Sequence, residues 1–340
     1  MIISNLGVGT FKPEPYKDEN YLFSFKDSII EAVKNGCNFI DCAINYRYQQ
    51  SEREVKDALD ELFSQNIVNR EQLVLCSKGG FIPLNYPFPH PYKWIEENII
   101  EQDLATKDEI IEDQHCLSAK FIEWSLNCSL KNLNVETIDI YYLHNVEMEL
   151  GYISYEALLQ KVKECFIVLE RLCDEGKIRY YGIASWNGFL NEPTFLEYLS
   201  LNDFVKIAKE VGGEKNRFKF VQSPYNLAKP HAYTYQNQQL DDELYYSLIQ
   251  ACIKLGLNFI ASSSLLQMNL FKKEFSNSIS SLLGSIFASD VQKALQFSRS
   301  ANGVVSALFS SIEPLHVKHN MEINLIPKTK IENYRKIFSL

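Results

Sequence analysis

The sequence predicts a (β/α)8 barrel spanning residues 1–340, because short strand-like apolar runs alternate with longer helical runs eight times along the chain. Strands that alternate with helices form a parallel sheet covered by its helices, and eight such units can close into a barrel. An open doubly wound sheet would carry a glycine fingerprint after its first strand. That fingerprint fails here, because Lys12 stands where a third glycine should follow Gly7 and Gly9.

Each expected strand is a short apolar run, and each expected helix is a longer amphipathic run that follows it. The expected strands are residues 6–10, 39–41, 73–78, 138–143, 181–185, 218–223, 258–262 and 304–308. The expected helices are residues 28–35, 51–62, 119–133, 155–175, 195–209, 241–255, 289–297 and 314–320. In the second helix, Ser51 followed by Glu54 has the spacing of a capping box, which predicts a helix start at that serine.

Two connections are longer than those usual between elements of a barrel. Residues 82–118 form an insertion after the third strand that is rich in proline and aromatic residues, and residues 263–288 form a serine-rich loop after the seventh. Both leave from the carboxyl ends of strands, where barrel active sites lie. Each is therefore either a wall of a substrate cleft or additional packing against the barrel.

Composition excludes several classes of protein. The 34 lysines and arginines are outnumbered by 43 aspartates and glutamates, and the net charge of −9 disfavours nucleic-acid binding. No apolar run is long enough to cross a membrane, so no membrane partner is expected. The eight cysteines form no Cys-x-x-Cys pair, which fits a reducing, cytoplasmic location. The histidines show no metal-ligand spacing beyond an uninformative His316-x-x-His319, so no metal site is expected.

Four polar residues of complementary type follow three neighbouring expected strands. The second strand ends at Asp41 and its loop carries Tyr46, the third ends at Lys78, and the fourth is followed by His144. A tyrosine is a weak acid near neutral pH, but a nearby ammonium lowers its pKa, and a carboxylate keeps that ammonium charged. Such a group can donate a proton to a carbonyl oxygen, while a reduction also needs a nicotinamide cofactor to supply hydride. Tyr48 is a rival acid in the same loop.

These four residues resemble the catalytic tetrad of the aldo-keto reductases, and similar motifs run along nearly the whole chain. Residues 6–11 are similar to the first-strand signature of that family, and residues 41–46 to its Asp-Thr-Ala-x-x-Tyr motif, with the same spacing between Asp41 and Tyr46. Further similar segments are residues 139–145, 176–183, 221–226 and 304–308, with Asn320 downstream.

The resemblance implies that Tyr46 is the general acid, Lys78 modulates its pKa, Asp41 pairs with the lysine and His144 orients the substrate. It also implies NADPH as the cofactor. NADH is an open alternative, because residues 310–316 contain no arginine or lysine to clamp a 2′-phosphate. The aromatic residue that stacks on nicotinamide in the family is replaced by Ser262. The implied cofactor contacts are Gly9, Thr10, Asp41, Ser185, Asn187, Gln222, Ser262, Leu265, Ser310, His316 and Asn320.

The expected function is therefore NAD(P)H-dependent reduction of an aldehyde or ketone, or the reverse oxidation of an alcohol, on a small-molecule substrate. The first alternative is a non-catalytic or regulatory barrel that keeps the cofactor cleft. A second is Schiff-base chemistry at Lys78, which would need neither Tyr46 nor Asp41. The sequence does not predict the identity of the substrate or the oligomeric state.

Overall fold

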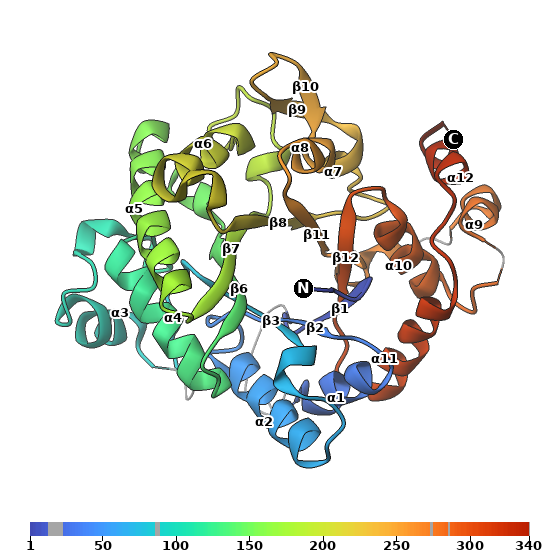
Figure 1. Cartoon of the computed structure of the whole chain (residues 1–340), viewed down its shortest axis with the longest axis horizontal. Helices are drawn as coiled ribbons and strands as arrows, with labels where there is room; N and C mark the ends of the chain where they lie inside the picture. The colour runs from blue at the N-terminus through green and yellow to red at the C-terminus, as the bar shows by residue number, and fades with distance from the viewer. Residues whose placement is uncertain (13–22, 86–88, 273–274, 285, 340) are drawn as a thin grey trace.

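The computed structural model describes residues 1–12, 23–85, 89–272, 275–284 and 286–339. Within these ranges, eight parallel strands close into a barrel in the order β1-β12-β11-β8-β7-β6-β3-β2. Figure 1 looks down this barrel, with the strands around the centre and the helices in a ring outside them. The predicted (β/α)8 barrel is confirmed.

The barrel strands match the predicted runs to within a few residues. Their apolar side chains are buried on both faces of the sheet, as expected where helices cover the outside and side chains fill the inside. The strands are β1 (Leu6–Gly9), β2 (Phe39–Asp41), β3 (Val74–Gly79), β6 (Ile138–His144), β7 (Ile178–Ala184), β8 (Phe218–Pro224), β11 (Asn258–Ser262) and β12 (Val304–Phe309).

A helix follows each barrel strand before the next one or, after β12, before the C-terminal segment. These helices are α1 (Lys26–Lys34), α2 (Gln50–Ser64), α4 (Ala119–Leu133), α5 (Tyr155–Asp174), α6 (Leu201–Gly212), α8 (Leu248–Lys254), α10 (Asp290–Ser300) and α11 (Pro314–Met321). Four shorter helices lie in the connections and the C-terminal segment: α3 (Pro91–Ile95), α7 (His231–Thr234), α9 (Asn277–Leu283) and α12 (Ile331–Lys336).

Two predicted helices begin later than expected, because serine caps set their starts. The helix predicted from residue 195 begins at Leu201, where the Ser200 hydroxyl accepts a hydrogen bond from the backbone of Asp203. The helix predicted from residue 241 begins at Leu248, where Ser247 forms a capping box with Gln250. The residues before it form a hairpin of β9 (Gln236–Gln239) and β10 (Tyr245–Ser247).

The capping box predicted at Ser51 is wrong. Helix α2 begins at Gln50 and has no side-chain cap. The Ser51 hydroxyl instead donates to the backbone oxygen of Thr10 over 3.0 Å, and Glu54 accepts from Arg47 over 2.5 Å. Both side chains thus attach α2 to the loop after β1 and to the turn that precedes the helix.

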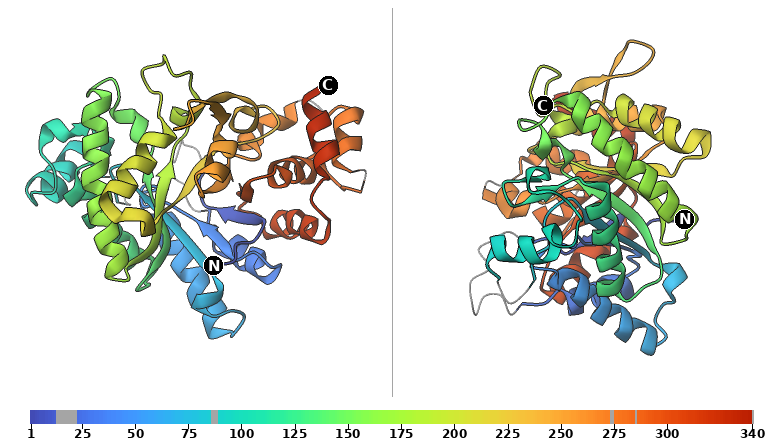
Figure 2. Two further views of the ribbon diagram at one scale, coloured as in Figure 1. Left: turned by 45° about the horizontal axis from the view of Figure 1, so that its top comes forward. Right: turned by 90° about the vertical axis from the view of Figure 1, so that its left-hand side faces the viewer.

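The two long connections lie where they were predicted. The insertion at 82–118 carries α3 and a small hairpin of β4 (Ile110–Ile111) and β5 (His115–Cys116). The loop at 263–288 carries α9. Figure 2 shows α3 and the C-terminal α12 on opposite sides of the barrel. Residues 86–88 of the insertion, and 273–274 and 285 of the loop, lie outside the described residues.

In the part of the chain that the structure describes, no helix is both long and apolar enough to cross a membrane. The same residues contain no group of three or more His, Cys, Asp or Glu side chains able to hold a metal ion.

Candidate active site

A cleft of about 780 Å³ opens at the carboxyl ends of the barrel strands. Its lining includes the last residues of β1, β2, β6 and β7, namely Gly9, Asp41, His144 and Ala184. Ten residues that the sequence singled out line this one cleft, although they lie on or after seven different barrel strands: Gly9, Asp41, Tyr46, His144, Ser185, Gln222, Ser262, Leu265, Ser310 and His316.

Four further candidates do not line the cleft. Lys78 is only 1% exposed and reaches the site through Asp41. Thr10 is buried behind Gly9 and donates to the backbone oxygen of Asp41. Asn187 offers its backbone N–H to a neighbouring loop, and Asn320 is buried at the end of α11. The predicted cofactor contacts of Thr10, Asn187 and Asn320 stay predictions.

Lys78 and Asp41 form a buried ion pair from adjacent strands. The Lys78 Nζ donates to Asp41 Oδ1 over 2.6 Å and to the backbone oxygen of Cys42 over 2.9 Å. Burial lowers the pKa of Lys78, but Asp41 and the neighbouring Tyr46 outweigh it, so the net pKa is raised above its ordinary value of 10.5. The side chain is therefore an ammonium at neutral pH, which disfavours the Schiff-base alternative because that chemistry needs a neutral amine.

Tyr46 lies beside this ion pair. Its ring centroid is 4.9 Å from Lys78 Nζ and 5.8 Å from the ring of His144, while Phe11 packs against it at 5.2 Å. Burial raises the pKa of Tyr46, the Lys78 ammonium opposes that rise, and Asp41 adds to it. The lysine thus acts on the pKa of Tyr46 in the expected direction, but burial has the larger effect and the net pKa is raised. Tyr46 is thus a protonated phenol at neutral pH.

His144 ends β6 and lines the cleft opposite Tyr46. Burial lowers the pKa of His144 well below its ordinary value, and the neighbouring Lys78 and His115 lower it further. The imidazole is therefore neutral at pH 7. Its Nδ1 is buried without a hydrogen-bond partner among the described residues, so Nε2 is the nitrogen left to meet a molecule in the cleft.

The loop after β7 is held by one carboxylate that sequence reasoning did not assign to the site. Glu147 Oε1 accepts from the hydroxyl of Ser185 over 2.8 Å. The same oxygen accepts from the backbone N–H groups of Trp186, Asn187 and Gly188 at 2.8–3.4 Å. Glu147 therefore fixes the backbone that carries Ser185 and Trp186 into the cleft. The only signal in the sequence is an acidic residue three positions after His144, and that pattern is equally typical of a solvated loop.

At the far end of the cleft, Ser310, Ser311 and His316 follow β12, and Glu313 lies among them. No arginine or lysine comes from this segment, but Lys12 lines the cleft from the loop after β1. The two loops meet directly, since the Ser310 hydroxyl donates to the backbone oxygen of Phe11 over 3.2 Å. Lys12 Nζ lies 3.6 Å from the centre of the Phe23 ring. The sequence did not indicate this lysine, because it is distant from residue 310 along the chain.

The long loop after β11 is a wall of the cleft, as one of its two interpretations predicted. Ser263, Ser264, Leu265, Gln267 and Met268 all line it. By contrast, no described residue of the insertion at 82–118 lines the cleft. The insertion instead contacts the end of β6, where His115 lies 2.7 Å from the backbone oxygen of His144.

The cleft fits a polar ligand as well as an apolar one. Besides His144, two of its lining residues have a buried polar atom with no hydrogen-bond partner in the described part of the chain: Asn45 Oδ1 and Ser263 Oγ. Buried polar atoms are normally paired, so such atoms are suited to a bound molecule. Its volume is within the range usual for small-molecule and cofactor sites.

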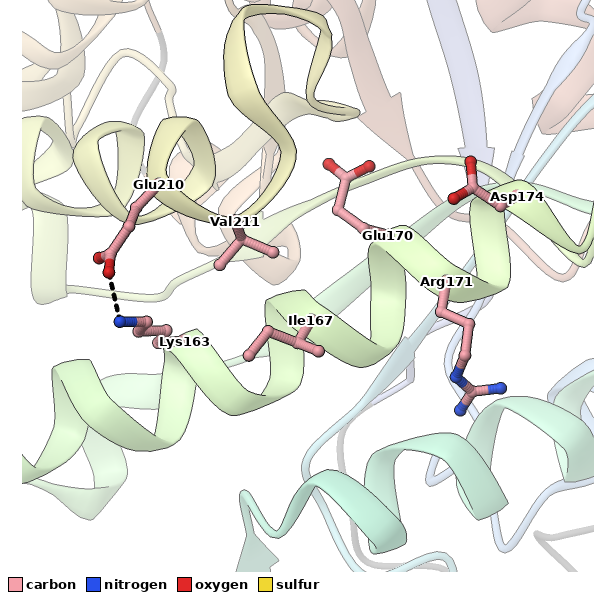
Figure 3. A pocket seen from close by; sticks show the side chains of 7 residues that line it. All are labelled: Lys163, Ile167, Glu170, Arg171, Asp174, Glu210 and Val211. Carbon is pink, nitrogen blue, oxygen red and sulfur yellow. Dashed lines mark hydrogen bonds and ion pairs between the residues drawn. The ribbon is translucent and has the colours of Figure 1, made fainter.

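A second hollow of about 460 Å³ lies on the outer surface between α5 and α6. Figure 3 shows its seven side chains, with Lys163 paired to Glu210 across the groove. Its other charged residues are also paired: Arg171 with Glu123 and Glu175, and both Glu170 and Asp174 with Arg217. This groove is a salt-bridged helix interface, and the barrel cleft is the candidate active site.

Comparison with known proteins agrees with this geometry. The family model described as "Aldo/keto reductase family" matches residues 5–281. The chain is 25% identical over 198 residues to glycerol 2-dehydrogenase (NADP(+)) of Hypocrea jecorina, covering 54% of this chain and 49% of the relative. It is 29% identical over 159 residues to NADH-specific methylglyoxal reductase of Escherichia coli, covering 47% of this chain and 40% of the relative. These alignments span half or less of the curated relatives.

Solved structures share the fold at low sequence identity. The aldose reductase of Schistosoma japonicum aligns with a TM-score of 0.60 at 13% identity, covering 99% of this chain and 88% of that one. An aldo-keto reductase from Bacillus halodurans aligns with a TM-score of 0.62 at 17% identity, covering 99% of this chain and 92% of that one. With a family model that matches most of its length, this chain belongs to the aldo/keto reductase family.

Proposed function

We propose that this chain is a nicotinamide-dependent oxidoreductase that reduces an aldehyde or ketone to an alcohol, or catalyses the reverse oxidation. The observation that carries the proposal is the Lys78–Asp41 ion pair, buried beside the Tyr46 phenol at the floor of the cleft. Family membership and the names of the relatives support the same class of reaction.

In this proposal Tyr46 gives its proton to the carbonyl oxygen as that oxygen gains negative charge. The phenolate that remains is stabilised by the ammonium of Lys78, and Asp41 keeps the ammonium charged and in place. Since burial keeps Tyr46 protonated, the general acid carries its proton across the neutral pH range. A positioned general acid contributes about 10²–10⁴-fold to a rate.

His144 orients the carbonyl in this scheme. A neutral imidazole with an unpartnered Nδ1 can donate from Nε2 to the oxygen that Tyr46 protonates. Tyr46 and His144 flank the same space with their rings at 71° to each other. Their donors would then converge on one oxygen, which fixes the carbonyl carbon for attack.

When bound, NADPH or NADH supplies the hydride that reduces the carbonyl carbon. We assign the nicotinamide end to Ser185, Gln222 and Ser262, which lie at the ends of β7, β8 and β11 around the tetrad. Gln222 is held there by a hydrogen bond from its Nε2 to Asp41, which leaves its amide oxygen to accept from a carboxamide. We assign the phosphate-bearing end to Ser310, Ser311, His316 and Lys12.

The wall around the tetrad favours a substrate with an apolar body. Phe11, Phe25, Phe81, Trp186 and Met268 line the cleft, and Phe81 packs edge-on against the His144 ring at 4.9 Å. Aromatic and thioether side chains of this kind cover apolar groups well and hydrated ones poorly. We therefore infer that aromatic or aliphatic aldehydes and ketones are better substrates than open-chain sugars.

The experiment is a titration with NADPH and NADH, followed by tryptophan fluorescence and then by turnover with an aromatic aldehyde. Trp186 lines the cleft, whereas Trp94 and Trp124 pack against each other elsewhere. Quenching on micromolar addition of either dinucleotide, followed by its oxidation with the aldehyde, is the expected result. Trp186→Phe is the matched control, because it should reduce the quenching while isothermal calorimetry still detects binding.

Failure of both dinucleotides to bind at micromolar concentration would contradict the proposal. Binding without turnover of any carbonyl or alcohol would instead favour the non-catalytic barrel. Borohydride trapping of a carbonyl compound on Lys78 would favour the Schiff-base alternative.

A further inference from the structure

A second histidine lies directly behind His144, and the proposed chemistry does not use it. His115 belongs to β5 in the insertion at 82–118 and is fully buried. Its Nε2 lies 2.7 Å from the backbone oxygen of His144, and its Nδ1 lies 3.0 Å from Glu149 Oε1. The other oxygen of Glu149 accepts from Lys161 of α5 over 3.2 Å. A chain of four residues therefore runs from the helix ring to the end of β6.

The backbone around this contact leaves no room for adjustment. Gly80 has a φ of +139°, and a Cβ there would lie 2.8 Å from the His144 oxygen and 2.9 Å from His115 Nε2. Phe81 packs edge-on against the rings of both His115 and His144, with centroids 5.2 and 4.9 Å away. His115 therefore holds the backbone of His144 in one position, and Phe81 holds both rings.

Hydrogen-bond counting gives the charge of His115. A backbone carbonyl can only accept a hydrogen bond, and so can an ionised carboxylate. Both ring nitrogens of His115 face such acceptors, and Lys161 beside Glu149 favours the ionised carboxylate. Both nitrogens must then carry a proton, which makes His115 an imidazolium paired with Glu149.

We propose that His115 is a doubly protonated positioning residue, which fixes the backbone of His144 and whose charge keeps the His144 imidazole neutral. The proposal rests on the proposed role of His144 in orienting a carbonyl. Lys78, Tyr46 and His115 are the titratable groups that face His144 from β3, the loop after β2 and β5. Of these, Lys78 and His115 are positive and oppose a further positive charge on His144. The depressed pKa of His144, caused by burial and by these two charges, is consistent with this arrangement.

The first test is nuclear magnetic resonance of the histidine ring nitrogens in the ¹⁵N-labelled protein, which needs neither cofactor nor turnover. At pH 7.5 we expect one buried histidine with both nitrogens protonated, and its signals should vanish in His115→Gln. His144 should be neutral in the wild type, and its pKa should rise toward the ordinary value in His115→Gln. His90→Gln is the matched control, because His90 is an exposed residue of the same insertion. An unprotonated nitrogen on His115 at pH 7.5 overturns the proposal.

Glu149→Gln keeps the side-chain shape and removes the negative charge. We expect it to cost His115 one of its two ring protons, which the same spectra detect even if His115→Gln fails to fold. Unchanged His115 signals in Glu149→Gln contradict the proposal.

The second test is kinetic and uses an aldehyde that the wild type reduces. A misplaced orienting group costs up to about 10²-fold in rate, so His115→Gln should lose about 10- to 100-fold in kcat with little change in KM for the cofactor. An unchanged kcat, with His115 protonated as expected, would show that the histidine is only structural. If the wild type itself reduces no aldehyde, the proposed function is contradicted. The resonance spectra still decide the charge of His115 in that case.

Discussion

Gln222 donates a hydrogen bond of 2.8 Å to Asp41 Oδ2, although 181 positions separate the two residues along the chain. The other oxygen of the same carboxylate accepts from Lys78 over 2.6 Å. Asp41 therefore joins the acid side of the site, where Tyr46 lies, to the residue that we assign to the nicotinamide. A change at Asp41 should affect proton donation and cofactor binding together.

The ion pair should be important for stability as well. In Asp41→Asn the buried ammonium of Lys78 loses its counter-charge, and breaking a buried pair in this way costs about 3 kcal/mol. Because the folded pKa of Lys78 lies above its ordinary value, the ion pair contributes fully to the free energy of unfolding at pH 7. That contribution is lost only as the pH rises through the pKa that Lys78 has in the folded protein.

Urea unfolding at pH 7 measures how much free energy of unfolding Asp41→Asn loses. The double variant Asp41→Asn/Lys78→Met should lose less than the two single variants added together; strict additivity would contradict the coupling.

Removing the Lys78 charge should change the pH dependence of reduction in a defined direction. The ammonium opposes the rise in the pKa of Tyr46, so Lys78→Met should raise that pKa further. An acid is active while it is protonated, so the alkaline limit of kcat/KM should move to higher pH. The plateau should fall by about 10²-fold because the phenol becomes a weaker acid. A pH profile of kcat/KM from pH 6 to 10.5 measures the plateau and the decline toward pH 10.5, which should be smaller in Lys78→Met than in the wild type. A larger decline in the variant would contradict the assignment.

Glu147 should control cofactor binding without touching the chemistry. Glu147→Gln replaces an acceptor that serves Ser185 and three backbone N–H groups, and weakening hydrogen bonds to a buried charge costs about 1–3 kcal/mol. We expect about tenfold weaker dinucleotide binding in a fluorescence titration. Glu192→Gln, at an exposed position of the following loop, is the control. Equal affinities in the two variants would show that the loop needs no such anchor.

Cofactor preference should be weak in this protein and easy to shift. The segment after β12 offers serines and a histidine to a phosphate, with Glu313 beside them and Lys12 opposite. We expect dissociation constants for NADPH and NADH within about threefold of each other. Ile312→Lys adds a cation to the lining and should tighten NADPH binding about tenfold over NADH. Leu315→Lys, which adds the same charge at an exposed position outside the lining, should leave the ratio unchanged.

The barrel and the tetrad could be predicted from the sequence for one physical reason. Parallel strands are apolar runs that end at one rim, so Asp41, Lys78 and His144 were placed together by their strand ends alone. Tyr46 follows in the loop after the second of these strands, and the aldo-keto reductase motifs add Gln222. The helix starts at Leu201 and Leu248 were less accessible, because the serine caps that set them are local signals hidden inside longer amphipathic runs.

The supporting residues could not be predicted in the same way. Glu147 and His115 act through contacts with residues 29 to 41 positions away, and neither has a sequence pattern that distinguishes it from a solvated or core residue. Lys12 meets the segment after β12 only because the barrel closes β1 against β12. The net pKa of Tyr46 depends on the balance of burial against one charge, which strand order alone does not determine.

The most direct measurement of the central claim is single-turnover reduction of an aldehyde by preformed complexes of the protein with reduced dinucleotide. In Tyr46→Phe we expect the rate to fall by about 10²–10⁴-fold while the dinucleotide dissociation constant changes less than about twofold, since only the proton donor is lost. Tyr48→Phe, in the same turn but outside the cleft lining, should react at the wild-type rate. A fully active Tyr46→Phe together with an inactive Tyr48→Phe would contradict the assignment of the acid.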